Sequence, residues 1–209
     1  MSGEVPPAPA LVLPVRILAR RRLIAQLGLV LVALVGAEVA TIPFLAGGLV
    51  PLHVGLGLGA LPAVGVKLVP TAERALRYYR GDPAERAEGA PDDLLRITAV
   101  VLVLSTVSLF GSGVVLWLLG IGVGSRILAG PAWILVHELS FIAFAFAAMV
   151  HALSYAARAV RWTRDDWAPA AALAGAARRH AWALGLLGMG IVVAAVVTVF
   201  GPSAGSVFG

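Results

Sequence analysis

The chain has 209 residues, of which 60% are hydrophobic and only 13% are charged. A soluble domain carries about 25% charged residues, so this composition excludes a soluble globular protein. The hydrophobic residues come in blocks of about twenty or more, which also excludes a disordered chain and an all-β domain. The absence of cysteine excludes disulfides, iron–sulfur clusters, thiolate metal sites and covalently attached c-type haem.

In chain order, residues 1–22 are rich in proline and end in three consecutive arginines, which predicts a disordered cytoplasmic tail without a signal peptide. Apolar segments that can each cross about 30 Å of hydrocarbon follow. They comprise residues 23–46, 51–71, 97–120, 132–157 and 181–200. The sequence therefore predicts an all-α integral membrane protein, a bundle of five transmembrane helices in a single domain of residues 23–201.

The basic residues are sorted to one side of these segments. Of the sixteen lysines and arginines, fourteen precede the first segment or surround the second and fourth connections. The remaining two are Arg126, in the opposite set of loops, and Lys67, inside a segment. Cytoplasmic loops carry the basic excess, which places the N-terminus inside and the C-terminus outside a bacterial plasma membrane. The net charge of +5 thus reflects topology and contact with anionic lipid, and we expect no nucleic-acid partner.

Ionisable side chains at membrane depth are costly, and each one is a functional hypothesis. They are Glu38, His53, Lys67, His137, Glu138 and His151. His180 lies beside two arginines at the inner surface, where an interfacial role is the simpler interpretation.

Counting from the helix ends places four of these residues at two levels. His53 and His137 share an outer level, and Lys67 and His151 share an inner one. The two levels lie fourteen residues apart on both helices, which is about 21 Å along a helix and brings the side chain back to nearly the same face. We therefore expect each pair to face the other across the bundle.

Two imidazoles from facing helices are typical ligands of b-type haem, and Gly57, one turn after His53, could make room for a flat porphyrin. Hydrogen-bonded packing histidines and an ordinary glycine helix contact are the alternatives. Lys67 stands where a second bis-histidine site would need an imidazole, so one haem is favoured over two. Lys67 could instead extend toward the interface, meet a haem propionate or line a quinone pocket.

The order of motifs resembles small bacterial membrane proteins similar to cytochrome b, which are distant relatives of the di-haem cytochrome b subunits of formate dehydrogenases and nickel–iron hydrogenases. The resemblance covers about residues 50–158. The motifs are His53-Val54-Gly55, Arg77-Tyr78-Tyr79-Arg80-Gly81-Asp82-Pro83, Gly111-Ser112-Gly113, His137-Glu138-Leu139-Ser140 and Met149-Val150-His151.

The resemblance implies a four-helix cytochrome-b-like core, with His53 and His137 as axial ligands of an outer haem b and His151 as a match to an inner histidine. Lys67 departs from the di-haem pattern. The leading hypothesis is an electron-transfer subunit that connects the quinone pool with a redox protein on the outer face. There Arg126 could pair with the propionates or with an acidic partner, and an ordinary loop arginine at the lipid headgroups is the alternative. A proton-coupled carrier component and a cofactor-free structural subunit of a larger membrane complex are the alternatives. Motifs of soluble enzymes are missing.

Overall fold

A computed structural model describes residues 15–86, 92–119 and 130–200, and these residues are almost entirely helical. Each of the long helices can cross a membrane by length and composition, so the described chain has five such helices. The elements are α1 (Val15–Thr41), η1 (Ile42–Gly47), α2 (Val50–Tyr79), α3 (Pro83–Arg86), α4 (Asp93–Leu118), α5 (Gly130–Trp167) and α6 (Ala176–Phe200). The all-helical fold predicted from composition is confirmed.

The long helices extend further at the arginine-rich end than hydropathy predicts, and α1 and α5 are two clear examples. Helix α1 begins at Val15, so residues 15–22 are helical, where the sequence predicts a disordered tail. Helix α5 continues to Trp167, ten residues beyond the predicted end at residue 157. Both extensions are polar, and ion pairs between them, described below, supply the stabilisation that apolar residues supply within the membrane.

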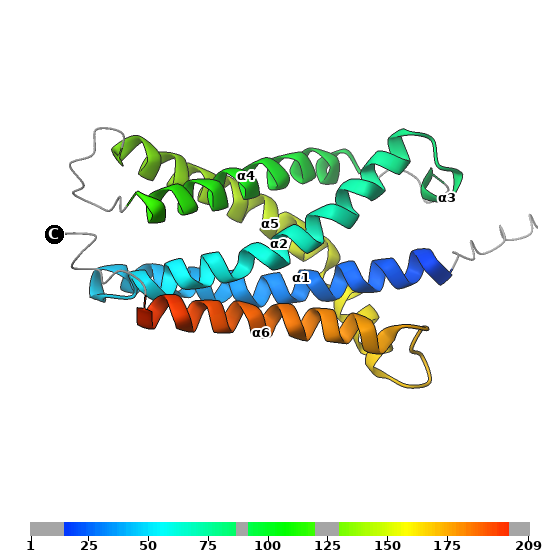
Figure 1. Ribbon diagram of the computed structural model, residues 1–209. Coiled ribbons are helices and arrows are strands. Elements are labelled where there is room, and N and C mark those ends of the chain that lie inside the picture. Colours follow the sequence, from blue (N-terminus) through cyan, green and yellow to red (C-terminus); the bar gives the residue numbers. More distant parts are fainter. Residues whose placement is uncertain (1–14, 87–91, 120–129, 201–209) are drawn as a thin grey trace, which may run out of the picture.

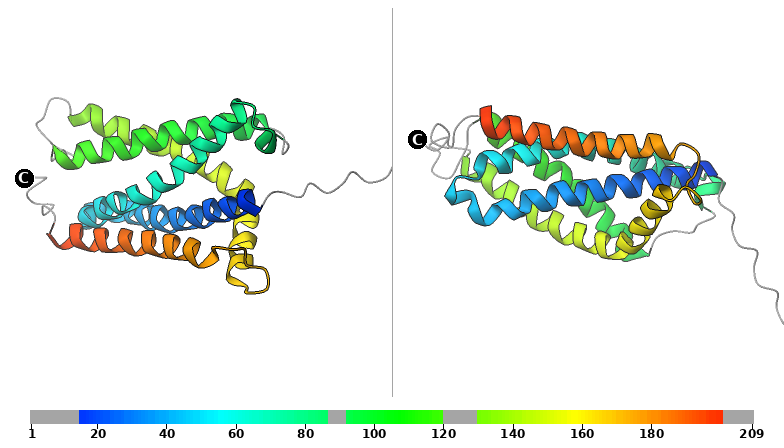
Figure 2. Two further views of the ribbon diagram at one scale, coloured as in Figure 1. Left: turned by 45° about the vertical axis from the view of Figure 1, so that its right-hand side comes forward. Right: turned by 90° about the horizontal axis from the view of Figure 1, so that it is seen from below.

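The long helices run along a common direction in two groups (Figure 1). Helix α4 packs most extensively against α5, while α1, α2 and α6 contact one another. Helix α2 runs diagonally between the groups and also contacts α4, and the far end of α5 crosses to reach α1 and α6 (Figure 2). In the described residues α2 and α5 make few direct backbone contacts with each other.

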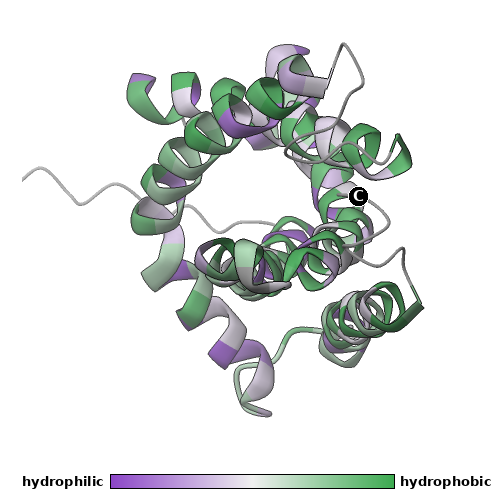
Figure 3. Cartoon of the chain, turned by 90° about the vertical axis from the view of Figure 1, so that its left-hand side faces the viewer, coloured by the Kyte–Doolittle hydropathy of each residue, from purple (hydrophilic) through white to green (hydrophobic). Residues whose placement is uncertain are grey.

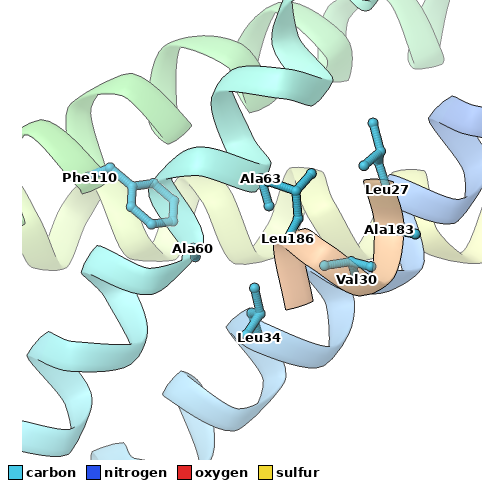
Figure 4. Packing of buried hydrophobic residues seen from close by; sticks show 8 residues of the cluster. All are labelled: Leu27, Val30, Leu34, Ala60, Ala63, Phe110, Ala183 and Leu186. Carbon is cyan, nitrogen blue, oxygen red and sulfur yellow. The ribbon is translucent and has the colours of Figure 1, made fainter. Parts of the chain in front are cut away.

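The buried centre is small and lies mainly between α1, α2 and α6 (Figure 4). It contains Leu27, Val30, Leu34, Ala60, Ala63, Phe110, Ala183 and Leu186. At the α2–α6 contact, a Cβ on Gly59 would collide with the backbone of Gly190, and one on Gly55 would lie 2.7 Å from the carbonyl oxygen of Ala194. Small residues at such contacts are typical of membrane helices, which gain stability from close packing.

Large hydrophobic side chains cover the outside of the bundle. Leu153 and Phe200 are among the most exposed, at 79% and 82%. Seen along the bundle, hydrophobic residues make up most of the helical ribbon (Figure 3). This surface fits contact with a lipid bilayer, and the chain is a multi-pass membrane protein.

All fourteen arginines that the topology prediction groups together lie in described residues, at or near one end of the bundle. That end holds the start of α1, the end of α2, α3 and the connection from α5 to α6, on the right in Figure 1. The opposite end holds η1 and the ends of α4 and α6. The fold therefore brings the charge clusters together, as the sequence predicts.

Candidate functional site

The outer pair of histidines comes from α2 and α5, and each ring is held by a neighbouring helix. The Nδ1 atom of His53 lies 2.9 Å from Oγ1 of Thr41 and 3.4 Å from the carbonyl oxygen of Glu38, both on α1. The Thr41 hydroxyl donates its own proton to that carbonyl at 2.6 Å. Because the carbonyl only accepts and the hydroxyl donates to that carbonyl, this arrangement favours the tautomer with the imidazole proton on Nδ1. The Nε2 atom of His53 keeps its lone pair.

His137 is anchored in the same way on α4. Its Nδ1 atom lies 3.0 Å from Oγ of Ser112 and 3.1 Å from the carbonyl oxygen of Leu109. The Ser112 hydroxyl donates to the same carbonyl at 2.9 Å. In both anchors the hydroxyl residue follows the carbonyl residue by three positions. His137 therefore also carries its proton on Nδ1 and leaves Nε2 available as a ligand.

The two outer imidazoles lie close enough for their charges to interact. They belong to α2 and α5, which make few backbone contacts in the described residues. The two side chains thus lie within electrostatic reach of each other, although the backbones of α2 and α5 make few contacts in the described residues. A pair of Nε2 atoms of this kind is the donor set that a bis-histidine haem requires, so these residues fit the cofactor that the resemblance implies.

Glu38 lies beside His53, which the sequence did not predict. One carboxylate oxygen of Glu38 is 3.9 Å from Nε2 of His53, and both side chains are largely buried. A Cβ on Gly57 would lie only 2.8 Å from the same oxygen. In this structure Gly57 makes room for the Glu38 carboxylate, and the predicted contact between Gly57 and a porphyrin stays a prediction.

The inner pair is brought together as well. Lys67 and His151 lie within electrostatic reach of each other, again across α2 and α5. The Lys67 ammonium packs over Gly28 of α1, where a Cβ would lie 3.2 Å from Nζ. Nδ1 of His151 is 3.4 Å from Oγ1 of Thr98 on α4.

The two levels differ in how well their polar groups are satisfied. Each histidine has a hydroxyl neighbour, but Nζ of Lys67 makes no hydrogen bond or ion pair with any residue that the structure describes. An ammonium at membrane depth without an acceptor is costly, so the inner level has unused capacity to donate hydrogen bonds.

The other predicted residues do not form such pairs. Glu138 is exposed on α5, although its charge interacts with His137. His180 stacks on Trp167, with ring centroids 4.1 Å apart, at the arginine-rich end. Arg126 lies outside the described residues. Within the described ranges, no group of three or more acidic or histidine side chains converges to hold a metal ion.

Comparison with protein-family models, with functionally described proteins and with solved structures gives no match for this chain. The resemblance to cytochrome b therefore stays a prediction, and the arguments about function depend on the geometry.

The sequence reasoning missed a buried ion network at the arginine-rich end. The Asp166 carboxylate, which is 0% exposed, accepts from Arg22 at 2.8 Å and from Gln26 at 3.1 Å on α1. It also accepts from Nε and Nη2 of Arg179 on α6, at 2.6 and 2.7 Å. This network joins α1, α5 and α6. The signal available in the sequence is the pair Asp165-Asp166 next to arginines, and an interpretation of the arginines as a topology signal alone leaves these carboxylates out.

A second cluster at the same end was missed for the same reason. Glu85 of α3 is 6% exposed and lies 3.7 Å from Arg20 and 3.5 Å from Arg74. Arg20 also donates to the carbonyl oxygen of Pro70 at 2.7 Å and contacts Glu73 at 3.3 Å. These contacts dock α3 against α1 and α2.

Proposed function

We propose that this chain is a membrane electron-transfer subunit that binds one b-type haem through Nε2 of His53 and Nε2 of His137. In this proposal it passes electrons between the quinone pool and a redox partner on the outer face. The observation that carries the proposal is the matched anchoring of the two imidazoles. Each donates from Nδ1 toward a main-chain carbonyl and a hydroxyl, on two helices that stand apart.

Such anchoring has a chemical consequence. A hydrogen bond from Nδ1 fixes the ring orientation and the tautomer, and it raises the basicity of Nε2 toward a metal. Thr41 and Ser112 therefore act as positioning residues for His53 and His137. The haem, when bound, supplies a one-electron carrier inside the bilayer.

We assign the inner level to the quinone. A quinone presents carbonyl oxygens that accept hydrogen bonds, and the Lys67 ammonium has donors without partners among the described residues. His151 lies within electrostatic reach of Lys67 and offers a second titratable group. The separation of about 21 Å between the two levels along a helix puts the two halves of the proposed electron path at different depths.

The test is a reduced-minus-oxidised optical spectrum of the purified protein. We expect a b-type α band in the parent protein, and its loss in His53→Ala and in His137→Ala. His180→Ala is the matched control, because His180 stacks on Trp167 far from the proposed ligands. A parent protein without the band, when expressed with sufficient haem supply, refutes the proposal.

We also propose that the arginine-rich end faces the cytoplasm of a bacterium and that the η1 end faces outward. Support comes from the arginine bias. Because the chain has no cysteine, single cysteines can report the topology. A membrane-impermeant maleimide added to intact cells should label Ala46→Cys, in η1, and should leave Ala168→Cys unlabelled. The reverse pattern contradicts this orientation.

One observation favours a second candidate, a proton-coupled carrier component. The Glu38 carboxylate and the His53 ring lie 3.9 Å apart at membrane depth, and two adjacent titratable groups can pass a proton. This candidate predicts proton flux into liposomes that contain the purified protein under an imposed pH gradient. It also predicts that Glu38→Gln abolishes the flux. Flux equal to that of empty liposomes counts against it.

A further inference from the structure

A cavity of about 470 Å³ opens at the arginine-rich end of the bundle, far from both histidine levels. It lies between the start of α1, the end of α2 and the short helix α3. Its charged lining consists of Arg16, Arg20, Glu73, Arg77, Asp82 and Glu85. The volume is within the range of about 300–1,000 Å³ that is typical of small-ligand sites.

The acidic side chains of this cavity already have partners. Glu85 is buried between Arg20 and Arg74, at 3.7 and 3.5 Å. Glu73 contacts Arg20 at 3.3 Å. Asp82 accepts at Oδ1 from the backbone N–H of Ala84 at 2.9 Å, as a cap of α3. The carboxylates are therefore committed to Arg20, to Arg74 and to the start of α3.

Two arginines of the cavity remain uncommitted. Arg16 lies in the first turn of α1 and Arg77 lies in the last turn of α2. Neither guanidinium makes an ion pair or hydrogen bond with any residue in the described part of the chain. The fold thus brings two free guanidiniums, from helix ends about sixty residues apart, to one cavity.

The guanidinium group is planar and presents paired N–H donors that match the oxygens of a phosphate. The cavity lies at the end of the bundle where lipid phosphates are found, because the helices that form it leave the hydrocarbon there. Several other arginines at this end, Arg20, Arg22, Arg74 and Arg179, have acidic partners. We propose that this cavity, which we name the α1–α3 pocket, binds a phosphate group through Arg16 and Arg77.

The phosphate could belong to an anionic phospholipid or to a soluble phosphate compound, and the experiment separates these sources. In one arm, native mass spectrometry of the detergent-purified protein compares retention of phosphatidylglycerol with retention of a galactosyl diacylglycerol, which has no phosphate. In the other arm, isothermal titration calorimetry measures binding of inorganic phosphate to the same preparation.

The variants are Arg16→Gln and Arg77→Gln, with Arg80→Gln as the matched control. Arg80 follows α2 at the same end but does not line the α1–α3 pocket. Each charge-assisted contact contributes about one factor of ten in affinity, so we expect about tenfold weaker binding in each pocket variant and less than about twofold change in the control. Thermal unfolding of all three variants confirms that they are folded.

Preferential retention of phosphatidylglycerol that the pocket variants lose supports the proposal and identifies a lipid as the source of the phosphate. Binding of inorganic phosphate alone, with the same sensitivity, supports it with a soluble source. The proposal is overturned if neither phosphate probe binds, or if binding weakens equally in Arg80→Gln. None of these outcomes depends on haem, so they are independent of the proposed electron-transfer function.

Discussion

Replacement of Asp166 by asparagine tests whether the buried ion network holds the arginine-rich end together. The carboxylate accepts hydrogen bonds from Arg22, Gln26 and twice from Arg179, at 2.6–3.1 Å. The side chains of Arg22 and Arg179 are only 8% and 7% exposed. Asp166→Asn keeps the shape of the side chain but removes the only full negative charge that these two guanidiniums share inside the network.

The magnitude follows from the burial. Removal of one partner from a buried ion pair costs about 3–5 kcal/mol, because the remaining charge is left uncompensated. For a chain of this length, each kcal/mol lowers the melting temperature by about 2–4 °C, so we expect a decrease of about 6–20 °C. The measurement is thermal unfolding in detergent, followed by the fluorescence of the five tryptophans.

Asp165→Asn is the matched control for this prediction. Asp165 is the preceding residue, but its side chain is 40% exposed and its carboxylate lies 3.9 Å from Arg22. Exposed pairs of this kind contribute about 0–1 kcal/mol, so we expect a much smaller decrease. In a double-mutant cycle, Asp166→Asn with Arg179→Gln should cost less than the sum of the single variants. Equal effects of Asp165→Asn and Asp166→Asn, or full additivity in the cycle, refute the reasoning.

A series of glycine-to-alanine variants separates three environments, with the melting temperature as the measurement. Gly59→Ala should cost about 1–3 kcal/mol because its Cβ meets the backbone of α6, and Gly57→Ala should cost less because it meets the flexible end of Glu38. Gly111→Ala, whose Cβ has no neighbour within 4 Å, should leave the melting temperature unchanged or slightly higher. An equal decrease of the melting temperature in all three variants would contradict the packing. Lys67→Met should raise the melting temperature because it removes an ammonium at membrane depth that has no hydrogen-bond or ion-pair partner among the described residues, and a decrease would reveal a structural role for the charge.

The levels of the titratable residues could be predicted because they depend only on counting along helices. His53, Lys67, His137 and His151 are each a fixed number of residues from a helix end, and 1.5 Å per residue converts those counts to depth. In the structure the members of each pair lie within electrostatic reach of each other, from α2 and α5. The helical rise per residue and the positions of the helix ends are therefore sufficient to predict which of these residues share a level.

The anchors of these histidines could not be predicted in the same way. Thr41 and Ser112 are ordinary helix residues in the sequence, and their role depends on which helix lies beside which. The same is true of Asp166 and Arg22, which are 144 residues apart and contact each other only because α5 crosses to α1. Hydropathy reports the position of a residue along the membrane normal and contains no information about its neighbours around the bundle.

Arginine illustrates why charge counting alone describes the arginine-rich end incompletely. The arginines there form one group by their position along the bundle, but their contacts differ. Arg22 and Arg179 are buried on Asp166, Arg20 is paired with acidic residues on two elements, and Arg16 and Arg77 have no partner among the described residues. Paired arginines extend α1 and α5 beyond the hydrophobic segments, whereas unpaired ones keep their capacity for a ligand. The distinction depends on the position of a few acidic side chains, so in a membrane protein with little charge it is the carboxylates that separate structural arginines from those available for binding.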